Sequence, residues 1–303
     1  MIDIIIRAGS FIAIILMGYL LKKIGFFKEE DFHILSRITI RITLPCAIVT
    51  SFAGKQIDPA LLSLTFMAIG CGLLYIVIGY LINRKHSRDQ QAFEMLNLPG
   101  YNIGTFVIPF AQSFLGALGV IAVSLFDTGN AVICLGGAYS LASMVKNGSK
   151  FSLKRILTTL AKSVPFMAYV IMLLVNLLNL PIPELVLSIA NIGSNANAFM
   201  AMLMIGVGFK LELSNKAQTG TIIKLLSIRY AVATVMALIS YFLLPFPEEV
   251  RQALVILVFS PIGSAVPGFT GELKGDVGLS SALNSFAMVI SIAITVVLLI
   301  VML

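Results

Sequence analysis

The chain has 303 residues, of which 58% are hydrophobic and only 12% are charged. Its mean hydropathy of +1.00 lies far above that of soluble globular domains, which excludes a water-soluble protein and indicates an integral membrane protein. The net charge of +7 would suggest a nucleic-acid partner for a soluble protein. Here basic loops that orient membrane helices explain it, so the expected environment is the lipid bilayer, with no nucleic acid.

Ten apolar segments are predicted to cross the membrane as helices. The clearest of them, such as FMAIGCGLLYIVIGYLI, approach or exceed the roughly 18 to 20 residues that span a hydrocarbon core about 30 Å thick. None alternates in polarity as a barrel strand would, so an all-α fold is expected. The predicted spans are residues 4–24, 33–53, 60–82, 92–114, 117–140, 154–178, 185–209, 221–245, 250–271 and 279–302.

Most basic residues follow the odd-numbered spans. The positive-inside rule places the loops that carry them in the cytoplasm and both termini outside it. We therefore expect a multi-pass protein of the plasma membrane, the inner membrane of a bacterial cell. The basic residues that follow these spans are Lys22, Lys23, Lys28, Arg84, Lys85, Arg88, Lys146, Lys150, Lys154, Arg155, Lys210, Lys216 and Lys274.

The linker SMVKNGSK divides the chain into two predicted repeats, residues 1–145 and 146–303, with five spans each. An odd number of crossings inverts the second repeat relative to the first. The fourth span of each repeat contains both proline and glycine, in NLPGYNIGTFVIPF (97–110) and VFSPIGSAVPGFTG (258–271). Matching interruptions in an inverted repeat are the sequence feature that best indicates the binding site of a secondary transporter.

The prolines and glycines in spans 4 and 9 predict broken helices. A proline inside a helix removes one backbone donor and disrupts the carbonyl one turn earlier, and such unpaired groups are costly in lipid. We therefore expect the two spans to cross inside the protein, where half-helix N-termini attract an anion and unwound carbonyls a cation. The alternative is that each proline is a structural kink repaired by neighbouring helices.

Candidate substrate-binding residues lie in the two broken spans or face their crossing from spans 5 and 10. The asparagines of spans 5 and 10, Asn130 and Asn284, could equally join helices without touching a ligand. Arg41, near the cytoplasmic end of span 2, is a weaker candidate for binding an anion and could instead extend towards water. The candidates are Asn102, Gly104, Pro109, Asn130, Pro261, Ser264, Pro267 and Asn284.

Asp127, in the motif FDTGN, is the candidate for ion coupling because it is an acidic residue well inside a predicted span. An ionisable group at that depth is costly unless it is paired or hydrated. It could carry a proton, bind sodium or neutralise a buried basic group; the alternative is a structural acid bonded to a neighbouring helix. We expect no cofactor and no metal site, because Cys46, Cys71 and Cys134 all fall in apolar segments.

Motifs for common enzymes are absent from the sequence. It contains no phosphate-binding G-x-x-x-x-G-K-[ST] loop, no H-E-x-x-H zinc motif and no nucleophile elbow. We therefore expect neither an ATP-driven pump nor a membrane protease, and predict that the protein is not an enzyme.

Several stretches resemble the auxin efflux carrier family, and the likeness runs in order over almost the whole chain. GYLLKKIGFFKEED and LSRITIRITLPCAIVTSF are similar to that family's first two spans, YNIGTFVIP to its fourth and FDTGN to its fifth. Two stretches depart from the family pattern. NAFMAMLMIGVG lacks a proline that the seventh span often carries, and PIGSAVPGFTG is richer in glycine than the usual ninth span.

This resemblance implies a PIN-like fold, similar to those of bile acid/sodium symporters. Spans 1, 2, 6 and 7 would form a scaffold that dimerises, and spans 3–5 and 8–10 a mobile transport core. The substrate would be a small organic anion bound beside the crossover helices, such as malate, malonate or an auxin-like acid, carried by alternating access with coupling to protons or sodium. A passive channel and a membrane receptor for such an acid are the alternatives.

Overall fold

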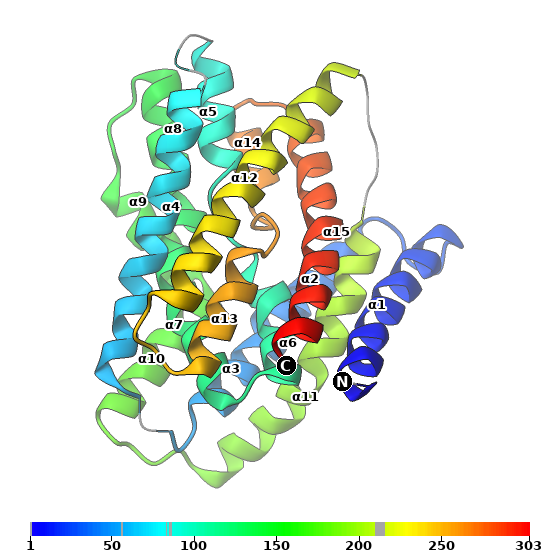
Figure 1. Ribbon diagram of the computed structural model, residues 1–303, viewed down its shortest axis with the longest axis vertical. Coiled ribbons are helices and arrows are strands. Elements are labelled where there is room, and N and C mark those ends of the chain that lie inside the picture. Colours follow the sequence, from blue (N-terminus) through cyan, green and yellow to red (C-terminus); the bar gives the residue numbers. More distant parts are fainter. Residues whose placement is uncertain (1, 56, 83, 85–86, 210–215) are drawn as a thin grey trace.

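A computed structural model describes residues 2–55, 57–82, 84, 87–209 and 216–303 of the chain. Lys85 and Lys210, which belong to the predicted basic loops, lie outside these residues, as does the side chain of Lys216. Every regular element in the described part is helical (Figure 1). The prediction of an all-α fold is therefore confirmed for these residues.

Seven helical stretches among the described residues are long and apolar enough to cross a membrane. The chain is accordingly a multi-span helical membrane protein. Its N- and C-terminal ends both lie in the lower half of Figure 1, whereas α5 and α12 begin at the top. The seven stretches are Ile2–Lys23, Asp31–Phe52, Pro59–Ile82, Ala117–Asn147, Glu184–Gly208, Gln218–Phe242 and Val277–Met302.

One set of helices packs around α11, and we call it the α11 group. α1 lies along α11, α11 packs on α3, and α3 in turn contacts α10. A close approach of α1 to α11 depends on Gly18, where an added Cβ would lie 2.6 Å from the carbonyl oxygen of Leu203. The elements of this group are α1 (Ile2–Lys23), α2 (Asp31–Ile38), the π-helical turn η1 (Thr39–Thr43), α3 (Leu44–Phe52), α10 (Val164–Leu177) and α11 (Glu184–Gly208).

The second set packs around α7, and we call it the α7 group. α7 lies between α4 and α13, and α12 and α14 both contact α15. Its elements are η2 (Pro59–Leu62), α4 (Ser63–Ile82), α5 (Arg88–Asn97), η3 (Ile103–Val107), α6 (Ile108–Phe114), α7 (Ala117–Val132), η4 (Ile133–Gly137), α8 (Ala138–Asn147), α12 (Lys216–Phe242), α13 (Glu248–Val258), α14 (Val266–Glu272) and α15 (Val277–Met302).

Both segments with proline and glycine are interrupted, and each interruption contains one proline, Pro99 or Pro261, and precedes another. The first lies between the end of α5 at Asn97 and the start of η3 at Ile103, and the second between α13 and α14. Pro267 lies in the first turn of α14, whereas Pro109 lies inside the helical stretch Ile103–Phe114, where α6 directly continues η3. A proline is tolerated at the start of α14 because the first N–H groups of a helix have no intrahelical partner. The interpretation as a helix breaker is therefore wrong for Pro267, which begins a half-helix, whereas Pro109 lies inside the half-helix that begins at Ile103.

The sixth predicted span is not one continuous helix, which corrects the prediction for residues 154–178. It consists of α9 (Leu153–Lys162) and α10, which meet at an angle of 82°. Ser163 caps α10 by accepting a hydrogen bond from the N–H of Phe166, and Pro165 occupies the first turn. These are helix-start signals at the beginning of the apolar run, directly after the basic and polar residues of α9. The bend places α9 against η4.

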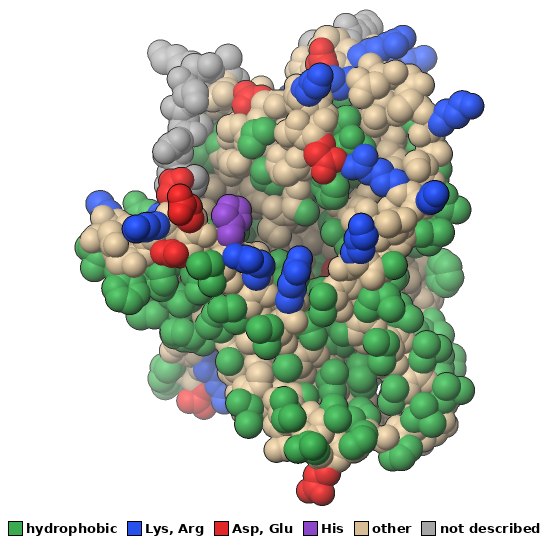
Figure 2. Space-filling model, turned by 180° about the vertical axis from the view of Figure 1, so that it is seen from behind, with side chains coloured by type: hydrophobic (Ala, Val, Ile, Leu, Met, Phe, Trp, Pro, Cys, Tyr) green, Lys and Arg blue, Asp and Glu red, His purple; other side chains and the backbone are tan. Residues whose placement is uncertain are grey.

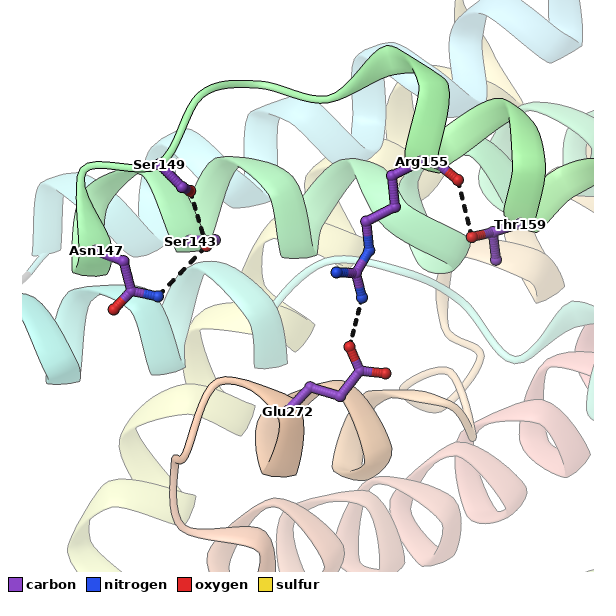
Figure 3. Close-up of polar contacts among 6 residues, drawn as sticks. All are labelled: Ser143, Asn147, Ser149, Arg155, Thr159 and Glu272. Carbon is purple, nitrogen blue, oxygen red and sulfur yellow. Dashed lines mark hydrogen bonds and ion pairs between the residues drawn. The ribbon is translucent and has the colours of Figure 1, made fainter.

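The linker between the two predicted repeats is bound back onto α8 (Figure 3). Gly148 ends that helix with φ of 64°, a left-handed conformation that favours glycine. Ser149 Oγ then donates to Ser143 Oγ at 2.8 Å. Beyond the linker, Arg155 of α9 forms an ion pair with Glu272 of α14.

Candidate functional site

The carboxylate of Asp127 lies where the α7 group meets the α11 group. Asp127 is on α7, and one of its oxygens accepts a hydrogen bond of 2.9 Å from Asn130 Nδ2, one turn further along the same helix. The other oxygen accepts a hydrogen bond of 2.8 Å from the hydroxyl of Tyr169 on α10. The carboxylate is thus bonded to both helix groups at once.

Asn130 also holds the first helix interruption in place. Its side-chain oxygen accepts from the backbone N–H of Tyr101 at 3.0 Å, and its side-chain nitrogen donates to the Tyr101 carbonyl at 2.9 Å. Asn284 of α15 contacts the second interruption in a similar way: its side chain donates a hydrogen bond of 3.4 Å to the carbonyl of Gly263. A backbone hydrogen bond of 2.9 Å from Asn102 N to Pro261 O joins the two interruptions.

A cavity of about 140 Å³ lies between the two helix groups, beside these interruptions. Five of the predicted site residues line it: Asn102, Gly104, Asp127, Asn130 and Ser264. The opposite wall comes from the α11 group, mainly from the first turns of α10. The other lining residues are Ile40, Leu44, Tyr101, Ile103, Thr105, Ala131, Cys134, Leu135, Ser163, Pro165, Phe166, Tyr169, Gly263 and Ala265.

The remaining predicted site residues do not line this cavity. Pro109 is buried in α6, and Pro267 lies in the first turn of α14. Pro261 is buried, with its carbonyl bonded to Asn102. Asn284 stands behind the second interruption, where its contact is with the backbone. These four residues shape the chain around the cavity.

Hydrogen-bond donors in the cavity wall are open to a solute. No side chain caps the start of the 12-residue helical stretch Ile103–Phe114, so its first N–H groups have no capping partner. The side-chain oxygen of Asn102 accepts from Thr105 Oγ1 at 2.5 Å, and its Nδ2 has no hydrogen-bond partner among the described residues. An uncapped helix start beside a free amide suits an anion.

Exposed basic residues adjoin the cavity-lining residues in sequence. Arg41 directly follows Ile40, and Lys162 directly precedes Ser163. Figure 2 shows Lys and Arg side chains around a recess in the rear face, with hydrophobic side chains covering most of the surface below it. Basic groups near an entrance raise the local concentration of anions.

Arg229 was missed by the sequence analysis, although it stands alone in the apolar run LLSIRYAVATV of α12. It is 1% exposed. One terminal nitrogen donates to the carbonyls of Gly100 at 2.9 Å, Ser260 at 3.0 Å and Pro261 at 3.3 Å, and the other donates to the Leu98 carbonyl. The expectation that unwound carbonyls face a solute is therefore wrong for these four, because the guanidinium occupies them.

Glu94 is a second buried ionisable residue that the sequence analysis did not single out. It lies on α5 with 0% exposure and forms an ion pair of 3.2 Å with Lys224 of α12. The sequence places Glu94 near the start of the fourth predicted span, where an acid would ordinarily reach water. Packing of α4 against it is close, because a Cβ on Gly79 would lie 2.9 Å from the Glu94 backbone.

Comparison with known proteins gives one informative match. No protein-family model matches the chain. A protein of Methanothermobacter thermautotrophicus named as an uncharacterized transporter is 26% identical over 210 residues. The match covers 67% of this chain and 66% of that protein, so the chain spans just under two thirds of its relative's length. The chain is thus a multi-span helical membrane protein similar to a protein named as a transporter.

Proposed function

We propose that the protein is a secondary active transporter that carries a small organic anion by alternating access. The observation that carries this proposal is the cavity between the two helix groups, because its wall combines Asp127 with an uncapped half-helix start. A site at the boundary of two packed units can be exposed to either side of a membrane when one unit moves against the other. The similarity to a protein named as a transporter supports this proposal.

The donors in the cavity favour a carboxylate as the substrate. Helix N-termini and amide nitrogens bind carboxylate oxygens, and the nearby Arg41 and Lys162 would attract them. The cavity volume of about 140 Å³ is below the roughly 300–1,000 Å³ of pockets for drug-sized ligands. Among the expected substrates, a short acid such as malonate or malate therefore fits better than a bulkier auxin-like acid.

Asp127 gives the proposed transporter a means of coupling. A substrate carboxylate in the same cavity would meet the charge of Asp127, and two like charges about 4 Å apart repel by about 4 kcal/mol at an effective dielectric constant of about 20. A proton or a sodium ion at Asp127 removes this repulsion, so the anion would travel with a cation. Asp127 is in this view the residue at which coupling takes place.

The larger architecture belongs to the same proposal. Ten spans arise if each interrupted segment crosses once and α9 with α10 counts as one crossing. The similar roles of Asn130 and Asn284 at the two interruptions support an inverted repeat of residues 1–145 and 146–303. The α11 group would be the scaffold, with α9 beside it, and the α7 group the transport core.

The resemblance to the auxin efflux carrier family extends this proposal beyond the single chain. Under this proposal the protein would be a member of that family in the plasma membrane, with both termini outside the cytoplasm and a homodimer formed through the scaffold. Packing of α1, α3 and α10 around α11 supplies a continuous helix group that could act as this scaffold.

Uptake into liposomes tests the function. Purified protein is reconstituted, and labelled malonate, malate and an indole acid are offered under separately imposed proton, sodium and voltage gradients. We expect saturable uptake of a short carboxylate, driven uphill by one cation gradient. Flux that rises linearly with concentration at a channel-like rate would indicate a passive channel, and binding without flux would indicate a receptor.

A further inference from the structure

The four carbonyls that bind Arg229 come from the ends of two helices. Leu98 is the C-terminal cap of α5, and Gly100 follows it within the first interruption. Ser260 and Pro261 follow the C-terminus of α13 in the second interruption. Helix C-termini carry partial negative charge, and carbonyls at such ends coordinate cations in transporters with interrupted helices. The convergence of two C-termini is therefore an environment built for a positive charge.

Arg229 supplies that charge without an acidic partner. Within the described part of the chain, no carboxylate lies within ion-pair distance of its guanidinium. The rings of Tyr75 and Tyr101 lie 5.4 and 5.2 Å from it, and the Tyr75 hydroxyl donates to the Arg229 backbone carbonyl at 2.9 Å. The carbonyls and the two ring faces are thus what compensates a buried cation.

The charge of Asp127 is separated from this cluster and lies near a helix start. A Cβ on Gly104, in the first turn of η3, would lie 3.7 Å from Asp127 Oδ2. The acid is therefore next to a helix N-terminus, whereas Arg229 is next to two C-termini. Each charge faces the helix end of opposite sign, so Asp127 does not need Arg229 as its counter-ion.

We propose that Arg229 is the resident cation of the two interruptions and takes the place that a sodium ion would otherwise occupy. Sodium is then excluded from these carbonyls, and as a second part of the proposal a proton is the coupling ion at Asp127. The part that concerns coupling rests on the proposed transport function. The part that concerns occupancy of the carbonyls by a fixed cation does not rest on that function, and it can be tested without measuring transport.

Thermal unfolding of the purified protein is the test. Wild type, Arg229→Ala, Arg229→Lys and the charge control Lys154→Ala are compared in sodium chloride and choline chloride at equal ionic strength. Lys154 is exposed on α9, so its replacement removes one charge without touching the interruptions. We expect wild type and Lys154→Ala to unfold at the same temperature in both salts. Arg229→Ala should lose several degrees in choline and regain part of them saturably with sodium, which can bind the vacated carbonyls.

Arg229→Lys distinguishes a fixed cation from a merely large side chain. Its ammonium keeps the charge but cannot serve four carbonyls in the fork geometry of a guanidinium. We expect a stability between those of wild type and Arg229→Ala, with no response to sodium. A wild type that sodium stabilises specifically, or an Arg229→Ala protein as stable as wild type in choline, would overturn the proposal.

A transport measurement closes the test and covers the case in which Arg229→Ala does not fold. Wild-type uptake of the carboxylate identified above is measured with a sodium gradient alone and with a proton gradient alone. Uptake driven by protons and unchanged by sodium supports the proposal, and sodium-driven uptake contradicts it. If no substrate is transported at all, the proposed function fails while the sodium titration of wild-type stability still decides the role of Arg229.

Discussion

Asp127 is the residue whose replacement should separate coupling from substrate binding. Asp127→Asn keeps the shape of the side chain and a partner for Tyr169, but it removes the negative charge and the bound proton. We expect uphill accumulation under an imposed proton gradient to be lost, whereas exchange of labelled for unlabelled substrate persists, because exchange needs no net movement of the coupling ion. Both fluxes are measured in liposomes with matched amounts of folded protein.

The neighbouring variant Tyr169→Phe is the control for this prediction. It removes the donor of the 2.8 Å hydrogen bond from α10 but leaves the carboxylate that would carry the ion. Accumulation should therefore remain coupled, with an altered rate. If Asp127→Asn loses thermal stability or yield while the folded fraction accumulates substrate normally, Asp127 has only a structural role.

Asn130 and Asn284 allow a comparison of two asparagines at corresponding places. Asn130→Ala leaves both the buried N–H and the carbonyl of Tyr101 without the partner they now have. An unsatisfied buried polar group costs about 1–3 kcal/mol. Asn284→Ala gives up one bond of 3.4 Å from a half-buried side chain. We expect the melting temperature to fall clearly further for Asn130→Ala, and equal losses would contradict this assignment.

At the residue scale, the sequence showed which charged residues lie inside predicted spans, but it did not show which residues bind them. Asp127 was recognisable because a lone acid interrupts an apolar run. Tyr169 was not, since it is 42 residues away on another helix and no periodicity relates the two. Arg229 could have been found by the argument applied to Asp127, because it too lies inside an apolar run. Basic residues were instead interpreted mainly as loop charges that orient the helices, with Arg41 as the exception.

At the scale of an element, the first interruption depends on Gly100 more than on Pro109. Gly100 has φ of 81°, and an added Cβ would lie 2.6 Å from Cys134 Sγ. Gly100→Ala therefore combines backbone strain of about 1–2 kcal/mol with a steric conflict. Pro109→Ala should cost less, because alanine is smaller than proline and adds a backbone N–H that can bond within the helical stretch Ile103–Phe114. Thermal unfolding and uptake of both variants test this, and a Pro109→Ala protein as impaired as Gly100→Ala would restore the proline as the helix breaker.

The elements show which sequence signals predict a helix end. Composition was sufficient for the long helices, because lipid-exposed backbone must be helical. Proline suggested the two interruptions, and Pro99 and Pro261 lie within them, whereas Pro267 marks where a helix resumes and the first interruption also needs Gly100. In the sixth span, Ser163 and Pro165 formed a start signal at the beginning of the apolar run. Hydropathy alone could not distinguish that bend from a straight crossing.

At the scale of the whole molecule, polar contacts join the two helix groups along the boundary that would have to move. Besides the bond from Tyr169 to Asp127, Gln112 of α6 donates to Ser194 Oγ at 3.2 Å and accepts from Asn197 Nδ2 at 3.1 Å, both on α11. Within the α11 group, Thr50 of α3 donates to the same Ser194 hydroxyl at 3.0 Å. Ser194 thus contacts both the proposed scaffold and the proposed core.

This shared residue permits a matched cross-linking experiment on the proposed motion. In a background in which Cys46, Cys71 and Cys134 are replaced by serine or alanine, Gln112→Cys with Ser194→Cys should allow a short thiol-specific, reducible cross-linker to join core and scaffold. Alternating access requires these groups to move relative to each other, so cross-linking should abolish uptake, and reduction should restore it. The readout is carboxylate uptake before cross-linking, after it and after reduction, with the cross-linked fraction measured by mass spectrometry.

Thr50→Cys with Ser194→Cys is the control, because it joins two helices of the α11 group and carries one of the same cysteines. If the α11 group moves as a unit, this cross-link should leave most of the uptake intact at the same cross-linked fraction. Full uptake by protein that is cross-linked between Gln112 and Ser194 positions would mean that the substrate passes without relative motion of the two groups. A fixed pore behaves in that way, whereas a carrier that exposes one cavity alternately to each side cannot.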